Sequence, residues 1–400
     1  MKNRMKLTLS LAFAALLSIP FMGISAYASD RPTGRLANLK IEDTAQLVNF
    51  DFDPNTTSYD VTVFEDVYGV RFTPTITGSA GSSVLVTMSG TDIETQTMRV
   101  SKNEQFELHL TEARECSSFN RRAMEDDCDY SVAIQAANNT YTVNVHRPGS
   151  DGLSNQFQEK FWDMGNGKQM TYYLYVPADY DKNKKYPVVV VPHGGGQFAV
   201  ASKDTLVRTA QATAFVKYKK DAIILVPHGN YSDLSFSGTF GWVERDDPQL
   251  KTTAFGDAVY NILMDVCRNY SVDRNRISVA GASMGGIGTM GIVAAHPETY
   301  AAAVIACPAV FYEKRTVPMK YFADRVKDSG IALWLTHAEA DPTINFGVTE
   351  DLMTVLDACG VKYHATILPK TTYLWPTAHF CWVPFFDNEA NLDWILSQSR

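Results

Sequence analysis

Hydrophobic and polar residues alternate along the N-terminal part of the chain, from about residue 36 to residue 147. Segments such as Ser58–Val63, Gly69–Ile76 and Tyr141–Val145 repeat with a period of two and are rich in β-branched residues. Gly, Asn, Asp or Pro occupies the turns between such segments. The pattern predicts strands that each bury one face, and it favours a small antiparallel β-sandwich.

The pattern changes after residues 148–155, a stretch containing Pro, Gly and Ser that is typical of a linker. The apolar runs Pro187–Val191 and Ala222–Val226 have no polar face, which indicates parallel strands covered on both sides. We therefore expect an α/β, doubly wound sheet over residues 156–400, after a sandwich over residues 36–147. Helices are expected at Phe255–Asn269, Gly286–His296 and Val348–Cys359.

Residues 1–28 have the pattern of a secretory signal peptide. A basic start is followed by the apolar stretch Leu7 to Ile19 and by the small-x-small site Ala26-Tyr27-Ala28. The alternative is a membrane anchor, but the apolar stretch is short and ends at Pro20, whereas a span needs about 20 apolar residues. We expect cleavage after Ala28 and a secreted, extracellular or periplasmic protein.

Charge and composition narrow the classes of partner. The chain is 45% hydrophobic, which is enough for a sizeable core, and its formal net charge is −8. Removing residues 1–28 would take away three basic residues and no acidic ones, so the exported chain would be more acidic still. Without any Lys/Arg run, the chain is a poor candidate for binding nucleic acid or an anionic membrane.

Six cysteines follow the expected cleavage site, and export would permit disulfides. Cys116 and Cys128 flank a polar loop and are the pair that we expect to be bridged. The remaining cysteines could form two bridges in three ways, or they could be buried thiols, and their spacing does not fit zinc ligands. These four are Cys267, Cys307, Cys359 and Cys381.

The segment Gly281-Ala282-Ser283-Met284-Gly285 carries the chemistry. It follows the apolar run Ile277–Ala280 and precedes an expected helix, so it has the strand–turn–helix context of a nucleophile elbow in an α/β-hydrolase. The glycines would let the chain make a sharp turn around Ser283. The alternative is a chance match in a Gly-rich turn, which the flanking pattern disfavours.

A serine hydroxyl needs a base, and in α/β-hydrolases the acid and the histidine follow the serine in that order. Asp341 comes just after the apolar strand Ile331–Thr336 and is the expected acid, with Glu339 as its rival. His379 lies in an expected loop and is the expected base. The other candidate base, His364, lies inside an expected strand.

Backbone N–H groups are expected to form the oxyanion hole. One donor would be Met284, directly after the nucleophile. The other would come from the glycine run after Pro187–Val191, with Gly195 favoured and Gly196 close behind. We expect His193, at the start of that run, to support the loop rather than to act on substrate.

Residues from about 156 to the end resemble bacterial secreted esterases of the feruloyl esterase, polyhydroxybutyrate-depolymerase-like and "predicted peptidase" group. The resemblance implies an α/β-hydrolase fold and a serine esterase activity. The matching segments are Tyr173–Pro177, Tyr186–Gly194, Val272–Ile277, the elbow with Gly286, His296–Glu298, Asp341-Pro342, His379 with Trp382, and Trp394.

The N-terminal part contains the segments Phe50–Tyr59 and Tyr141–Arg147. Through these segments it resembles the cadherin-like (immunoglobulin-like) β-sandwich modules of exported bacterial proteins, and the resemblance implies no catalytic residue. An esterase of a hyperthermophile in the same group has such a domain before its hydrolase domain, where it is associated with oligomer assembly. The resemblance therefore implies a homo-oligomer formed through residues 36–147.

Aromatic residues are frequent in the loops expected around the site, which would suit a ring-bearing acyl group, although many of them could be packing residues. The expected activity is a serine carboxylesterase on feruloyl-type or polysaccharide-linked esters. Alternatives are an acetyl or polyester esterase, a serine peptidase of the same fold, and a non-catalytic surface binding protein. No metal or cofactor is implied. The aromatic residues are Trp242, Phe311, Tyr312, Tyr373, Trp375 and Trp382, of which Trp242, Tyr312, Trp375 and Trp382 are the expected substrate contacts.

Overall fold

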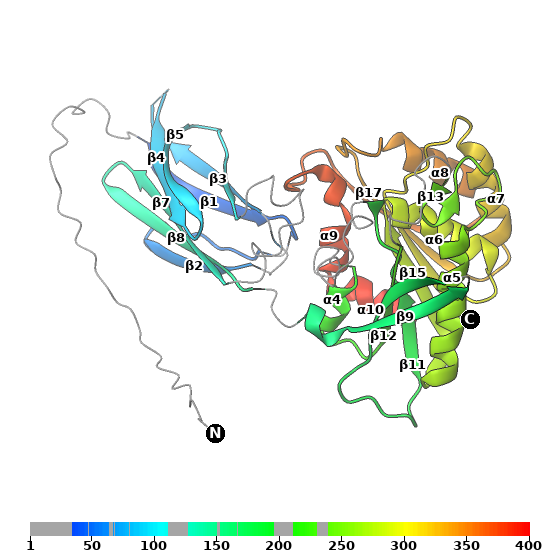
Figure 1. Ribbon diagram of the computed structural model, residues 1–400. Coiled ribbons are helices and arrows are strands. Elements are labelled where there is room, and N and C mark those ends of the chain that lie inside the picture. Colours follow the sequence, from blue (N-terminus) through cyan, green and yellow to red (C-terminus); the bar gives the residue numbers. More distant parts are fainter. Residues whose placement is uncertain are drawn as a thin grey trace, which may run out of the picture.

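Two packed sheets form the N-terminal part of the molecule, drawn in blue to green in Figure 1. The computed structural model describes residues 34–46, 48–63, 67, 69–79, 81–110, 127–149, 153–165, 167–195, 211–229 and 239–400. The expected signal peptide, Cys116 and Gly196 lie outside the described residues. The strands of this part are β1 Arg35–Asp43, β2 Ser58–Thr62, β3 Gly69–Thr77, β4 Ser83–Gly90, β5 Ile93–Ser101, β6 Phe106–His109, β7 Cys128–Ala136 and β8 Asn139–Arg147.

Alternation along these strands explains the sandwich. In β7, Tyr130, Val132 and Ile134 are buried, while the residues between them are more exposed. One sheet has the order β1-β3-β6 and the other has the order β2-β8-β7-β4-β5. The expected sheet was antiparallel, but β2 pairs with β8 in parallel. No hairpin joins two strands so far apart in the sequence, so the chain does not force them to be antiparallel.

An eight-stranded sheet forms the second part, with the order β18-β17-β16-β15-β11-β12-β10-β9. Within this sheet, β12, β11, β15, β16, β17 and β18 are parallel to one another, while β10 is antiparallel to both β9 and β12. The strands are β9 Gln158–Gly165, β10 Lys168–Tyr175, β11 Tyr186–Val190, β12 Ile223–His228, β15 Val272–Ala282, β16 Ala302–Ala306, β17 Ala332–Ala338 and β18 His364–Leu368, besides the short β13 Thr239–Phe240 and β14 Val243–Glu244.

Helices cover both faces of this sheet, as the apolar runs predict. In β11, Val188 and Val190 face the layer of α5 to α8, and Val189 faces the layer of α4, α9 and α10. All three valines have no exposed surface. The helices are α4 Thr213–Lys217, α5 Ala254–Asn269, α6 Met284–Ala295, α7 Thr316–Val326, α8 Gly347–Ala358, α9 Trp382–Phe386 and α10 Glu389–Ser397, with 3-10 turns at Ser154–Gln156 and Ala378–Phe380.

The topology brings the residues of interest to one edge of the sheet. The loops after β11, β15 and β17 all leave from the carboxyl ends of parallel strands, where α/β folds place their sites. The buried apolar side chains of the sandwich are continuous with those under α4, α9 and α10, so the two parts share one cluster. Among the described residues, no helix has the length and apolar character needed to cross a membrane.

Candidate active site

Ser283 lies on a sharp turn between β15 and α6. Its φ is 59° and its ψ is −119°, a conformation that a residue with a side chain rarely adopts and that costs about 1–3 kcal/mol. Close backbone approach explains the glycines on either side. A Cβ at Gly281 would lie 2.2 Å from the carbonyl oxygen of Gly285, and one at Gly285 would lie 2.1 Å from that of Pro192. The motif therefore has the steric constraints of an elbow.

Ser283, His379 and Asp341 form a hydrogen-bonded chain. The His379 Nε2 lies 3.1 Å from the Ser283 Oγ, and its Nδ1 lies 2.7 Å from the Asp341 Oδ2. A carboxylate can only accept, so Nδ1–H donates to Asp341 and leaves Nε2 able to accept a proton from the serine. Trp382 packs edge-on against the imidazole, with ring centroids 5.3 Å apart. The geometry suits a nucleophile, a base and an orienting acid.

Both oxygens of Asp341 accept hydrogen bonds. Oδ1 accepts from the N–H groups of Thr343 and Ile344 at 2.8 and 2.9 Å, while Oδ2 faces His379 and His337. Burial alone would raise the pKa of Asp341, but the bonds from His337 and His379 outweigh it and hold that pKa well below its usual range. The carboxyl group is therefore ionised at neutral pH and keeps its hydrogen-bond acceptors turned toward both histidines.

The two rival residues lie elsewhere. Glu339 is exposed, and its Oε2 accepts from the backbone N–H of Lys370 instead of a histidine. His364 is an exposed residue of β18 whose ring contacts Trp334 and Trp394. The structure brings Asp341 and His379, not these alternatives, to Ser283.

His337 is a site residue that the sequence analysis did not single out. It has no exposed surface, and its Nε2 lies 3.1 Å from both the Asp341 Oδ2 and the Ile344 carbonyl oxygen. Both partners are acceptors, so Nε2 must carry the proton, and in the neutral ring Nδ1 accepts from the Thr349 hydroxyl at 2.7 Å. His337 thus holds the same carboxylate oxygen of Asp341, Oδ2, that faces His379. Its spacing of four residues before Asp341, at the end of an apolar strand, was the available signal.

The residues expected to donate to an oxyanion lie just after β15 and β11. Met284 is the first residue of α6, so the helix supplies no acceptor for its N–H. The loop carrying Gly195 is held by His193, whose Nδ1 donates to the Gly194 carbonyl at 2.7 Å and whose Nε2 accepts from the Gly229 N–H at 3.1 Å. Burial and the neighbouring His228 lower the pKa of His193 to about 3, so it stays neutral and keeps both bonds.

Trp242 corrects one expectation. It has no exposed surface, and its indole N–H donates to the His193 carbonyl oxygen at 3.0 Å. A buried side chain cannot contact a bound ester, so Trp242 supports the loop of His193 and Gly195 and is not a wall of the substrate site. The indole also packs against Gly288, where a Cβ would lie only 2.5 Å from it.

The other expected substrate contacts have partners within the protein. The Tyr312 hydroxyl donates to the Glu244 carbonyl at 3.3 Å, and Trp375 stacks on His109 of the sandwich with centroids 3.6 Å apart. Trp382 is mostly buried beside His379. By contrast, Phe311 is 55% exposed. It lies two residues after Ala309, whose N–H donates to the Ser283 carbonyl.

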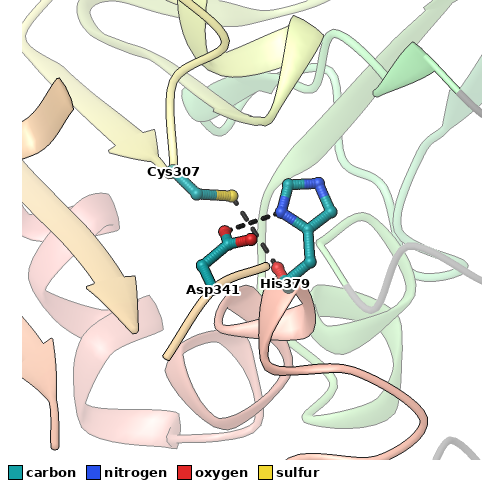
Figure 2. Close-up of side chains that lie close together, drawn as sticks. All are labelled: Cys307, Asp341 and His379. Atoms are coloured by element: carbon teal, nitrogen blue, oxygen red, sulfur yellow. Dashed lines mark hydrogen bonds and ion pairs between the residues drawn. The ribbon is translucent and has the colours of Figure 1, made fainter. Parts of the chain in front are cut away.

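Figure 2 shows Cys307 beside Asp341 and His379, with its sulfur turned toward them. Ligand atoms of Cys307, Asp341 and His379 lie within 4.8 Å of one another, a spacing that could hold a metal ion. Two of these residues, Asp341 and His379, are already joined by a hydrogen bond, and the Cys307 thiol contacts the His379 carbonyl at 3.8 Å. Burial and the adjacent Cys381 raise the pKa of Cys307 well above its usual range, which keeps it a thiol and disfavours it as a metal ligand.

The cysteine predictions have a mixed outcome. Cys267, Cys307, Cys359 and Cys381 are free thiols in the structure, which agrees with the alternative of unbridged cysteines. The bridge between Cys116 and Cys128 stays a prediction because Cys116 lies outside the described residues.

Comparison with known proteins supports the fold. The family model described as "Putative esterase" matches residues 165–343, which is less than half of the chain. No curated protein matches the chain. A crystal structure of a thermostable esterase matches with 19% identity and a TM-score of 0.54, over 86% of this chain and 99% of its own. Because this coverage exceeds residues 156–400 alone, the likeness extends into the sandwich, and at this identity it shows the fold: an α/β-hydrolase.

Two further structures match with lower scores. The feruloyl esterase module from Clostridium thermocellum, an S954A mutant complexed with sinapinate, is 18% identical over 61% of this chain and 94% of its own, with a TM-score of 0.41. A protein described as a "putative dipeptidyl aminopeptidase IV" from Bacteroides ovatus is 15% identical over 90% of this chain and 50% of its own, with a TM-score of 0.48.

Proposed function

We propose that this protein is a secreted serine carboxylic-ester hydrolase that works through an acyl-enzyme. The observation that carries the proposal is the hydrogen-bonded chain from Ser283 through His379 to Asp341, on an elbow with the strained backbone of a nucleophile. The esterase family match over residues 165–343 supports the choice of an ester as substrate. Secretion rests on the signal-peptide pattern of residues 1–28.

In the proposed reaction, the Ser283 Oγ attacks the ester carbonyl while the His379 Nε2 takes the hydroxyl proton. The N–H groups of Met284 and Gly195 would stabilise the oxyanion, with Gly196 as a further candidate. His379 then gives its proton to the leaving alcohol, and the acyl group remains on Ser283. A water molecule, activated by the same imidazole, releases the acid and restores the serine. Asp341 stays ionised throughout and stabilises the imidazolium.

For the substrate, we propose aromatic acyl esters of the feruloyl type or polysaccharide-linked esters. Phe311 supports this choice because it offers an exposed ring two residues from the contact with Ser283. We also propose that the sandwich is a cadherin-like module. Tyr59 supports this because its hydroxyl exchanges hydrogen bonds with the backbone of Asp53, fastening the turn that carries the resemblance.

The central test is hydrolysis of p-nitrophenyl acetate and methyl ferulate by the purified protein. Ser283→Ala is expected to lower kcat by at least about 10³-fold, since it removes the nucleophile. Ser278→Ala is the matched control: it lies on the same strand, and its hydroxyl contacts the Ile395 carbonyl, away from His379. It should retain activity within about threefold. A native protein that cleaves no ester, and whose Ser283 resists a fluorophosphonate probe, would refute the proposal.

Substrate class is tested with Phe311→Ala. If the exposed ring contacts an aromatic acyl group, KM for methyl ferulate should rise about tenfold while KM for p-nitrophenyl acetate should change little. Equal effects on both esters would reject Phe311 as an aromatic subsite. A panel of aminoacyl nitroanilides separates esterase from peptidase activity.

A further inference from the structure

The loop that carries His379 is held from the sandwich. Between the end of β18 at Leu368 and the 3-10 turn at Ala378, residues 369–377 form neither helix nor strand. A segment of this kind does not fix its own conformation through a backbone ladder. Its first residues are held by Glu339, which accepts from the Lys370 N–H, whereas Tyr373 and Trp375 make their side-chain contacts with strands β3 and β6.

Four sandwich residues form the contact face. Arg71 pairs with Glu107, and Gly69 pairs with His109 in the antiparallel ladder of β3 and β6, so all four point to the same side of the sheet. Arg71 donates to the Glu107 Oε1 from Nε and Nη2, both at 3.2 Å. The Glu107 Oε2 lies 3.1 Å from the His109 Nε2. Glu107 therefore holds the arginine and the histidine in fixed positions.

Arg71 and His109 each contact one aromatic residue of the loop. The Arg71 guanidinium lies 4.4 Å from the centre of the Tyr373 ring, a distance at which a cation and an aromatic face attract. His109 stacks on Trp375 with an interplanar angle of 6°. The result is that Tyr373 is only 1% exposed, although it lies in a loop.

Two further details show that the fit is close. The Gln46 side-chain amide donates to the Tyr373 carbonyl at 2.9 Å, so the backbone of the loop is held as well as its rings. A Cβ at Gly69 would lie 2.4 Å from the Tyr373 hydroxyl and 3.2 Å from the Trp375 Cβ. A side chain at position 69 would thus push the loop away.

We propose that the sandwich positions the catalytic base, and that Arg71, Glu107 and His109 are positioning residues acting through Tyr373 and Trp375. This inference rests on the proposed function, because it assigns His379 as the base. Trp375 lies four residues before His379, so a displaced loop changes the distance from the His379 Nε2 to the Ser283 Oγ, now 3.1 Å. Trp375 is accordingly a contact between the two parts of the chain and not a substrate contact.

The test compares His109→Ala and Arg71→Ala with His146→Ala in the full-length protein. His146 is the matched control, because it is a sandwich histidine that bonds to Asp129 on a different sheet. We expect each of the first two variants to lower kcat on p-nitrophenyl acetate by about tenfold with KM nearly unchanged, as a misplaced base should. His146→Ala should keep the native kcat.

A conservative variant separates positioning from stability. His109→Phe retains a flat ring that can stack on Trp375, so it should restore most of the kcat that His109→Ala loses. Thermal unfolding should be similar for the two variants. The proposal is overturned if Arg71→Ala and His109→Ala match the control, or if kcat falls only in proportion to unfolded protein. Failure of the proposed function would show instead as absent Ser283-dependent hydrolysis in the native protein.

Discussion

Asp341 and His379 share a hydrogen bond, yet the molecule holds them in different ways. Asp341 follows β17 directly, and its partners Thr343, Ile344 and His337 all lie within four residues of it. His379 follows a long irregular loop whose anchors lie in the sandwich, more than 260 residues earlier in the chain. Asp341 is held by residues close to it in the sequence, whereas the loop before His379 is held in part by residues far from it.

The positions of Asp341 and His379 therefore depend on different parts of the molecule. The position of Asp341 depends on one strand and one turn of the eight-stranded sheet, so it should tolerate changes in the sandwich. The position of His379 depends on how the two parts of the chain pack. Changes near Asp341 should therefore alter charge and tautomer, whereas changes in the sandwich should alter the distance between His379 and Ser283.

The largest effect is expected from Asp341→Asn. An amide at this position could donate to Nδ1 and favour the wrong imidazole tautomer, so kcat should fall by about 10⁴-fold with little change in KM. Steady-state kinetics on p-nitrophenyl acetate measures the loss. Glu339→Gln is the control, because that carboxyl group is exposed and faces the Lys370 N–H. A similar loss in both variants would mean that the acid has been misassigned.

A fall in pH should affect activity and stability separately. Activity is expected to fall as the solution is made acid, because a protonated imidazole at His379 cannot take the proton of Ser283. The depressed pKa of Asp341 means that its contribution to stability is complete above the ordinary aspartate range, near pH 3.9, and is lost only as the pH falls below it.

Kinetics and thermal unfolding between pH 4 and pH 8 test this separation. The protein should lose activity reversibly across this range without an unfolding transition. Activity and folded fraction that decline together would show that protonation acts on the fold and not on the base.

His337→Asn should have an intermediate effect. It removes a hydrogen bond to a carboxylate, worth about 1.5–3 kcal/mol, so kcat should fall about tenfold or more. Asp341 would then attract the imidazolium more strongly, and the acid limb of the pH profile should move to higher pH. His337→Gln can place its amide nitrogen near the former Nε2 and should recover most of the activity. Equal losses in both variants would reject His337 as the residue that orients Asp341.

Sequence patterns predicted the parts of the site that are fixed locally. Ser283 and Asp341 follow apolar strands directly, so their place at the edge of the sheet follows from strand position alone. The glycines of the elbow were also predictable from local sequence, because a sharp turn between a strand and a helix requires them. The apolar runs on both faces of β11 and β12 likewise predicted the covered sheet.

Contacts between distant segments were not predictable in this way. Trp375 and Trp242 have the composition of a substrate wall, but burial depends on which segment packs against them. Trp375 contacts His109 only because β6 lies beside the loop that precedes His379. Trp242 contacts the His193 carbonyl oxygen, at the start of the loop that carries Gly195. Neither pairing leaves a periodic signal in the sequence. His337 had only a weak signal, its place at a strand end four residues before Asp341, and its bonds to Asp341 and Thr349 depend on the turn and the helix that follow.

The smallest effect is expected from Trp242→Phe, which addresses the oxyanion side of the site rather than the acid or the base. The variant keeps most of the packing but loses the donor to the His193 carbonyl, worth about 0.5–1.5 kcal/mol. We expect kcat to fall about two- to tenfold with the pH profile unchanged, because the loop moves but His379 does not. Trp394→Phe is the control, since Trp394 packs on Trp334. A rise in KM for methyl ferulate alone would instead return Trp242 to the substrate site.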